Sequence, residues 1–136
     1  MTPLITTSHR TSNPYEEAFG YSRAVRRGNQ IFVSGTTSVS TNSPIPIILH
    51  AGDAYRQTTT ALHESIYAIE KLGGKKEDVV RVKLFVRRHE DCDLVGRAMK
   101  DILSGEGVAW AATMIVGVSF VSEGMLVEVE LDAVVG

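Results

Sequence analysis

The sequence of 136 residues contains a single cysteine, Cys92, which excludes an internal disulfide. No apolar run approaches the roughly 20 residues that a membrane-spanning helix needs. The first ten residues, from Met1 to Arg10, lack the apolar segment of a secretory signal peptide. We therefore expect a protein of the cytoplasm that has no membrane partner.

Charge of one sign is not in excess either. The chain has 14 basic and 16 acidic residues, and its formal net charge is -2. This balance provides no general attraction to nucleic acid or to an anionic membrane. Basic residues also do not interleave with aromatic residues in the manner of a nucleic-acid surface, so no nucleic-acid partner is expected.

The motifs of several cofactor and metal sites are missing. The chain has no phosphate-binding loop and no Gly-x-Gly-x-x-Gly segment. Its four histidines, His9, His50, His63 and His89, are scattered, and none is paired at the spacing of metal ligands. We predict that they are surface residues and that the chain holds no metal.

The length and the hydrophobic content of 43% predict a single domain over residues 1–136. Hydrophobic periodicity and turn residues predict the order β, β, β, helix, β, helix, β, β. Residues 8–19, which Pro14 interrupts, are interpreted as a surface loop. Two helices on one face of a mixed sheet form the simplest arrangement, an α+β two-layer domain. The predicted strands cover residues 4–7, 20–25, 30–35, 79–86, 109–116 and 125–133, with a short one possible at 45–49, and the helices cover 53–72 and 91–103.

Particular residues support these predictions. Asp53 and Asp91 are in position to cap the N-termini of the two helices. In the strand 79–86, alternation directs Val80 toward the core and Val79 and Phe85 toward the opposite face. In the last strand, alternation places Glu128, Glu130 and Asp132 on one face. Such a row has two interpretations, a solvated outer face or a face on which one carboxylate is a general acid or base.

Five segments that follow one another along the chain carry a family resemblance: Gly20–Val25, Ile31–Gly35, Asp53–Thr58, Lys76–Val86 and Leu126–Ala133. Taken in this order, they resemble the Rid family of reactive intermediate deaminases, which is also called the YjgF family. Proteins of this appearance also carry the older label endoribonuclease L-PSP. The resemblance implies a chorismate-mutase-like fold and a homotrimer with a central barrel-like β core and ligand clefts between subunits. An exposed apolar sheet face agrees with such an interface.

The resemblance also implies an activity and its residues. Active family members hydrolyse imines and enamines, such as 2-aminoacrylate, to keto acids and ammonia without a metal or cofactor. A glutamate serves the proton transfers, and a tyrosine and a serine line the cleft. The matching positions here are Glu128, Tyr21 and Ser34.

One departure concerns the substrate anchor. The family binds the substrate carboxylate through an arginine in a Pro-Ala-Arg-Ser motif. Aligned on Thr113, that arginine position is Ala111, which indicates a subgroup without the arginine. Arg97 and Arg23 are candidate replacements. Trp110 is either an apolar or stacking wall of the site or a core or interface residue.

Two principal functions therefore remain open. The first is a hydrolase of an atypical imine or enamine in which Glu128 is the acid and base. The second is a trimeric binding protein for a small molecule that has kept the cleft and lost the chemistry. A ribonuclease is supported by the family label alone. The candidate ligand-binding residues are Tyr21, Ser34, Arg97, Trp110, Ala111 and Thr113.

Overall fold

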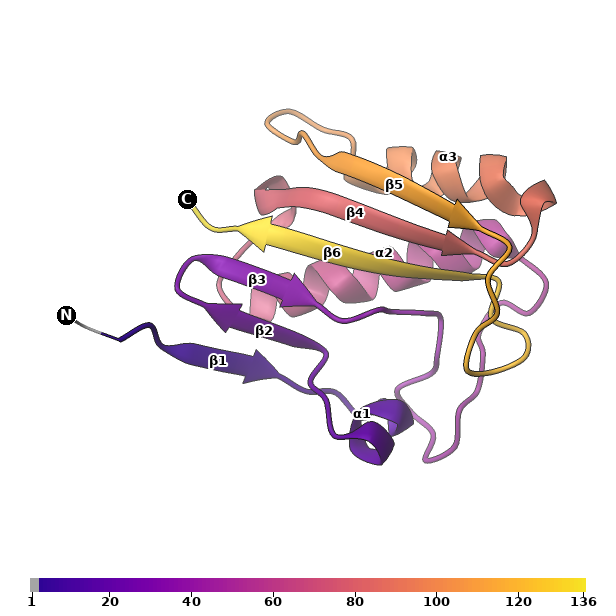
Figure 1. Ribbon diagram of the computed structural model, residues 1–136, viewed down its shortest axis with the longest axis horizontal. Helices are drawn as coiled ribbons and strands as arrows, with labels where there is room; N and C mark the ends of the chain where they lie inside the picture. The colour runs from indigo at the N-terminus through magenta and orange to yellow at the C-terminus, as the bar shows by residue number, and fades with distance from the viewer. Residues whose placement is uncertain (1–2) are drawn as a thin grey trace.

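The computed structural model describes residues 3–136, which form a six-stranded sheet with two long helices packed on one face (Figure 1). The strand order is β1-β2-β3-β6-β4-β5, and only the β4–β5 pair is parallel. This arrangement confirms the predicted α+β fold with a mixed sheet. The strands are β1 (Thr6–His9), β2 (Ala24–Arg27), β3 (Gln30–Val33), β4 (Val79–Val86), β5 (Ala111–Val116) and β6 (Val127–Val134).

Two long helices, α2 (Ala54–Lys71) and α3 (Cys92–Leu103), cover the same face of the sheet (Figure 1). Helix α2 packs mainly on β6, and α3 packs beside α2. The core lies between the two layers and includes fully buried Leu62 and Ile69 from α2. Within the described residues, no helix is long and apolar enough to cross a membrane.

Strand β6 shows the predicted alternation. Val127, Val129 and Leu131 are fully buried toward the helices, and Glu128 and Glu130 lie half-buried on the opposite face. Because β6 pairs with β3 on one side and β4 on the other, its carboxylates lie in the middle of the open sheet face. This central position partly shields them from solvent.

The predicted orientation of residues at the start of β4 was wrong. Val79 is fully buried and Val80 is 43% exposed, the reverse of the expected pattern. The register with β6 shifts between Val79 and Arg81, as in a β-bulge. The extra residue inverts the alternation locally, and from Val82 onward the inward side chains are as predicted.

The interpretation of residues 8–19 as a surface loop was also wrong. Strand β1 extends to His9, and a short helix, α1, covers Pro14–Phe19. The Asn13 side chain caps it by accepting a hydrogen bond of 2.9 Å from the Tyr15 N–H. Pro14 occupies the first turn, where its missing N–H has no helical partner in any case. Gly20 ends the helix with a φ of 78°.

The two predicted helix caps have different outcomes. Asp53 accepts a 2.9 Å hydrogen bond from the Arg56 N–H, which confirms it as the cap of α2. Asp91 precedes α3 but makes no capping hydrogen bond. Its carboxylate accepts instead from the Arg88 guanidinium at 2.8 Å. The suggested strand at 45–49 is reduced to an isolated bridge between Val39 and Ile48.

Candidate functional site

A cavity of about 210 Å³ lies where β6 begins and the segment after β3 passes it. Glu128, Tyr21, Arg23 and Gly35 line it, together with residues of helix α1. The segment after β3 is held in place by a backbone bridge between Thr36 and Val129, whose two hydrogen bonds measure 2.8 and 2.9 Å. This bridge places Gly35 directly beside Glu128.

The Glu128 carboxyl group is half-buried in this cavity. Burial raises its pKa above the usual range, the nearby Arg23 guanidinium opposes that rise, and Glu130 adds to it. Within residues 3–136, no hydrogen bond or ion pair engages the Glu128 carboxylate. A carboxyl group with a raised pKa and free lone pairs is suited to both accepting and donating a proton.

Gly35 allows the Glu128 carboxyl group to lie flat against the backbone. A Cβ atom at position 35 would lie 2.9 Å from the Glu128 Cδ and 3.1 Å from each carboxylate oxygen. Real Cβ atoms do not approach other atoms so closely, so any side chain at position 35 must displace the carboxyl group. Gly35 therefore determines where Glu128 lies in the cavity.

Arg23 is 2% exposed and forms an ion pair with Glu16 of α1, with 3.2 Å between its Nε and Oε2. Its Nη1 donates to the carbonyl of Gly35 at 2.7 Å and to the Thr36 hydroxyl at 3.0 Å. Its Nη2 donates to the Tyr21 hydroxyl at 3.2 Å. These contacts use four of the five N–H donors of a guanidinium, so Arg23 cannot offer a two-bond fork to a substrate carboxylate.

Tyr21 and Ser34 have different positions relative to the cavity. Tyr21 lines it, and the Arg23 guanidinium lies 5.4 Å from the centroid of its ring. The Ser34 hydroxyl donates to the carbonyl of Ser22 at 2.7 Å, and Ser34 does not line the cavity. Of the two, the single chain brings Tyr21 alone to Glu128.

The candidate residues of β5 lie away from Glu128 in the single chain. Glu128 pairs with Phe85, and Phe85 pairs with Ile115, four residues beyond Ala111. Ala111 is therefore about 10 Å across the sheet and about 13 Å along it from Glu128. Thr113 lies on the same face, halfway between Ala111 and Ile115.

Two further candidates also lie outside the cavity. Trp110, just before β5, packs against the hydrophobic core. Arg97 of α3 is exposed, and its guanidinium lies 5.4 Å from the centroid of the Tyr55 ring of α2. Neither residue lines the cavity that contains Glu128.

Sequence reasoning missed the buried Glu16–Arg23 pair and the contact of Gly35 with Glu128. The helix that carries Glu16 had a detectable signal, because Asn13, Pro14 and the acidic residues that follow are typical of a helix N-terminus. The contact between Gly35 and Glu128 had none, since the two residues are far apart in sequence. Within the described residues, no three His, Cys, Asp or Glu side chains gather in a way that could hold a metal ion.

The sheet, its two covering helices and the cavity at the start of β6 define the class of protein, an α+β domain of the kind found in YjgF structures. The model of the family described as Endoribonuclease L-PSP matches residues 11–135. The chain belongs to this family, which is the YjgF or Rid family.

Individual relatives agree with this assignment. An uncharacterized protein of Streptomyces coelicolor, SCO2049, is 33% identical over 124 residues, which cover 91% of this chain and 88% of the relative. A 2-iminobutanoate/2-iminopropanoate deaminase of Dermatophagoides farinae is 27% identical over 115 residues, 85% of each chain. Rv2704, a YjgF-family member from Mycobacterium tuberculosis, is 30% identical in sequence. Its crystal structure matches this fold with a TM-score of 0.81, and the match covers 96% of this chain and all of Rv2704.

Proposed function

We propose that this protein hydrolyses a small imine or enamine and that Glu128 is its general acid and base. The observation that carries the proposal is the Glu128 carboxyl group, half-buried beside Arg23 and Tyr21 with its pKa raised and no internal partner. The family includes a relative named as a 2-imino acid deaminase, which supports the reaction class.

The chemistry requires one group that both accepts and donates a proton. In the proposed reaction, Glu128 takes a proton from a water molecule as the water oxygen attacks the imine carbon. It then gives that proton to the nitrogen, which yields a carbinolamine. In a second transfer Glu128 takes the proton of the new hydroxyl group and passes it to the nitrogen as the C–N bond breaks, which leaves a carbonyl product and an amine or ammonia. An enamine first receives a proton on carbon to become the imine. A carboxyl group with a raised pKa is suited to both directions of transfer.

The proposed substrate differs from a small 2-imino acid in its anchor. Position 111 is alanine, and Arg23 uses four of its five N–H donors within the chain. The cavity around Glu128 has an aromatic lining from Tyr15, Phe19 and Tyr21. These features favour a substrate with a neutral or aromatic group where the usual substrate has a carboxylate.

We also propose that the site is completed by a second copy of the chain in a homotrimer. The open sheet face exposes large apolar side chains that a monomer gains nothing by exposing. Ala111 and Thr113, which are too far from Glu128 within one chain, then reach the cavity from a neighbouring subunit. The most exposed of the apolar side chains are Phe32 at 47%, Val80 and Ile115 at 43% each, and Val134 at 40%.

A trimeric binding protein without turnover is the second candidate, favoured by the alanine at position 111.

The test of the hydrolase proposal is hydrolysis of 2-aminoacrylate, which a serine dehydratase generates and semicarbazide traps in competition. Native protein, Ala111→Arg and Glu128→Gln are compared. Activity that appears only with Ala111→Arg supports an intact Glu128 site with a substrate lacking the carboxylate. The hydrolase proposal is overturned if neither the native protein nor Ala111→Arg hydrolyses 2-aminoacrylate or a neutral imine.

Light scattering tests the assembly. A trimer is expected at micromolar concentration, and a monomer would contradict the shared site.

A further inference from the structure

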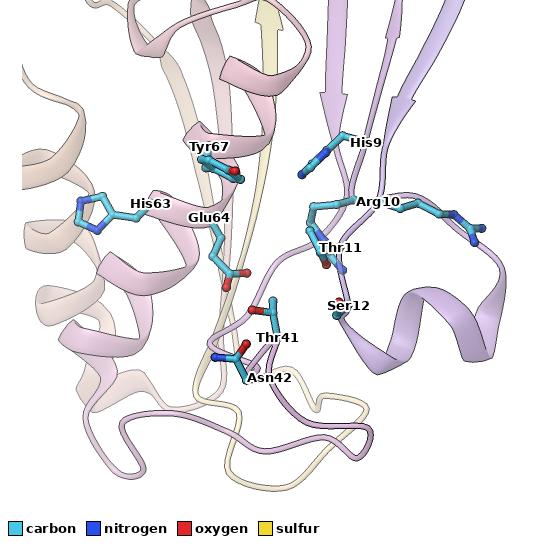
Figure 2. A pocket seen from close by; sticks show the side chains of 10 residues that line it. His9, Arg10, Thr11, Ser12, Thr41, Asn42, His63, Glu64 and Tyr67 are labelled. Atoms are coloured by element: carbon cyan, nitrogen blue, oxygen red, sulfur yellow. The ribbon is translucent and has the colours of Figure 1, made fainter.

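A second and larger cavity, of about 470 Å³, lies between the end of β1 and helix α2 (Figure 2). His9 lines it from β1, and Glu64 and Tyr67, three residues apart on one face of α2, line it from the other side. Thr41 and Asn42 lie at its lower side. Arg23 is the one lining residue that it shares with the cavity around Glu128.

Two polar groups on opposite sides of this cavity lack partners within residues 3–136. The His9 Nε2 atom is buried and makes no hydrogen bond. The Glu64 carboxylate is half-buried, and no hydrogen bond or ion pair engages it. Buried polar groups in proteins are nearly always paired, so the unpaired His9 Nε2 at this cavity points to a ligand, and the Glu64 carboxylate on the opposite side offers that ligand a second polar contact.

The unmatched charge in the cavity is negative. Glu64 points its carboxylate into the space, and the side chains of Arg10 and His63 point away from it (Figure 2). The positive charge of Arg23 is balanced by its ion pair with Glu16. Burial raises the pKa of Glu64, the Arg23 guanidinium lowers it, and Glu16 raises it. A bound cation stabilises the ionised form of such a carboxyl group.

One wall of the cavity suits the organic part of a cation. The Tyr67 ring is 52% exposed and meets the His9 ring edge-on, with 6.0 Å between the ring centroids. The Lys71 ammonium already lies over this ring, 5.2 Å from its centroid. The exposed part of the ring can therefore cover the carbon chain of a ligand whose ammonium group lies at Glu64.

We propose that this cavity binds a small organic amine in its ammonium form. The ammonium group donates to the Glu64 carboxylate and to the His9 Nε2, and its carbon chain lies on Tyr67. The His9 and Tyr67 rings already meet edge-on, and Glu64 lies one helical turn from Tyr67, so the site is preformed. The proposal does not depend on the chemistry of Glu128 and extends the protein's binding capacity beyond it.

The test uses butylammonium chloride as the probe and 1-butanol as its uncharged counterpart of equal chain length. Binding is followed by NMR through the ring signals of His9 and Tyr67 in the native protein, in Glu64→Gln and in Glu70→Gln. Glu70 lies on the same helix, is exposed and does not line the cavity, so Glu70→Gln is the matched control. Chemical unfolding of each variant verifies that it is folded.

Saturable shifts of the His9 and Tyr67 signals are expected with butylammonium. Glu64→Gln is expected to bind about tenfold more weakly, because it loses a charge-assisted hydrogen bond. Glu70→Gln is expected to match the native protein. Absence of saturation at about 100 mM probe overturns the proposal. Equal binding by folded Glu64→Gln, or equally tight binding of 1-butanol, also overturns it.

Discussion

Alanine in place of Gly35 introduces a methyl group 2.9 Å from the Glu128 Cδ. The methyl carbon and the carboxyl group cannot both keep their positions, because ordinary contacts between such atoms are longer. The methyl group is bonded to the backbone, which the Thr36–Val129 bridge holds, so the carboxyl group has to rotate away. The atoms that must move are the far end of a flexible side chain, so the cost in folding free energy is small, about 1 kcal/mol.

The first consequence of Gly35→Ala is a change in the acidity of Glu128. A displaced carboxyl group loses part of its burial, the largest cause of its raised pKa, so its pKa should fall toward the usual range. Carbon-13 NMR of the labelled carboxyl group measures this value directly and needs no substrate. If Glu128 is the acid and base, turnover should fall about 10- to 100-fold, because the displaced carboxyl group no longer lies where it can exchange protons with the substrate.

Gly96→Ala is the control for this experiment. A Cβ atom at position 96 in helix α3 meets only the Met114 Cε, at an ordinary distance of 3.8 Å. Alanine favours a helix by about 1 kcal/mol over glycine, so Gly96→Ala should stabilise the protein slightly and leave the Glu128 pKa unchanged. The argument for Gly35 is refuted if Gly35→Ala also leaves the Glu128 titration and the urea midpoint of the native protein unchanged.

Three further predictions concern stability. Glu16→Gln leaves the Arg23 charge buried and unpaired, which should lower the free energy of unfolding by about 3–5 kcal/mol. Urea titrations measure this change, and Glu17→Gln, at an exposed position, should have almost no effect. Gln57→Leu removes three hydrogen bonds to the backbone and should lower it by about 2–3 kcal/mol; an unchanged value would contradict the bonding seen here. Glu128→Gln should abolish turnover yet stabilise the protein at pH 7. Because the pKa of Glu128 is raised in the folded state, the native protein loses stability as pH rises through that pKa. The advantage of Glu128→Gln should therefore disappear below about pH 4, where the carboxyl group is protonated in both states. Thermal unfolding of both proteins at pH 7 and below pH 4 tests this.

The sequence made Arg23 one of two candidates to replace the substrate-binding arginine that the family resemblance expects at position 111. This residue is near Glu128 and carries the appropriate charge, yet Glu16, Gly35, Thr36 and Tyr21 engage it. Its role within the chain is to connect α1 to the segment after β3 and to moderate the acidity of Glu128. Replacing the family anchor therefore requires a group from a neighbouring subunit or a substrate that has no carboxylate.

Periodic patterns allowed much of the fold to be predicted. Helix α2 and strand β6 repeat apolar residues at the spacing of their own geometry, and both were found close to the predicted bounds. Helix α1 was missed because Pro14 was taken as an interruption, although proline is well suited to the first turn of a helix. The inverted pair Val79 and Val80 was missed because a bulge depends on the partner strand.

The candidate site was predicted in part. Alternation placed Glu128 on a face with two other carboxylates, and family resemblance was needed to choose among the three. Tyr21 lies in the same cavity, whereas Ser34, Trp110, Ala111, Thr113 and Arg97 do not line it in the single chain. Their roles as ligand-binding residues stay predictions that depend on the proposed assembly.

The sequence by itself determined which faces of α2 and β6 are apolar, because those patterns are local and repeat every few residues. Only the tertiary structure decided that Gly35 supports the Glu128 carboxyl group and that Glu16 neutralises Arg23. It also decided that His9 and Glu64 share a cavity. These contacts join residues of different elements, and their distances depend on how strands pair and helices pack, which no local pattern specifies.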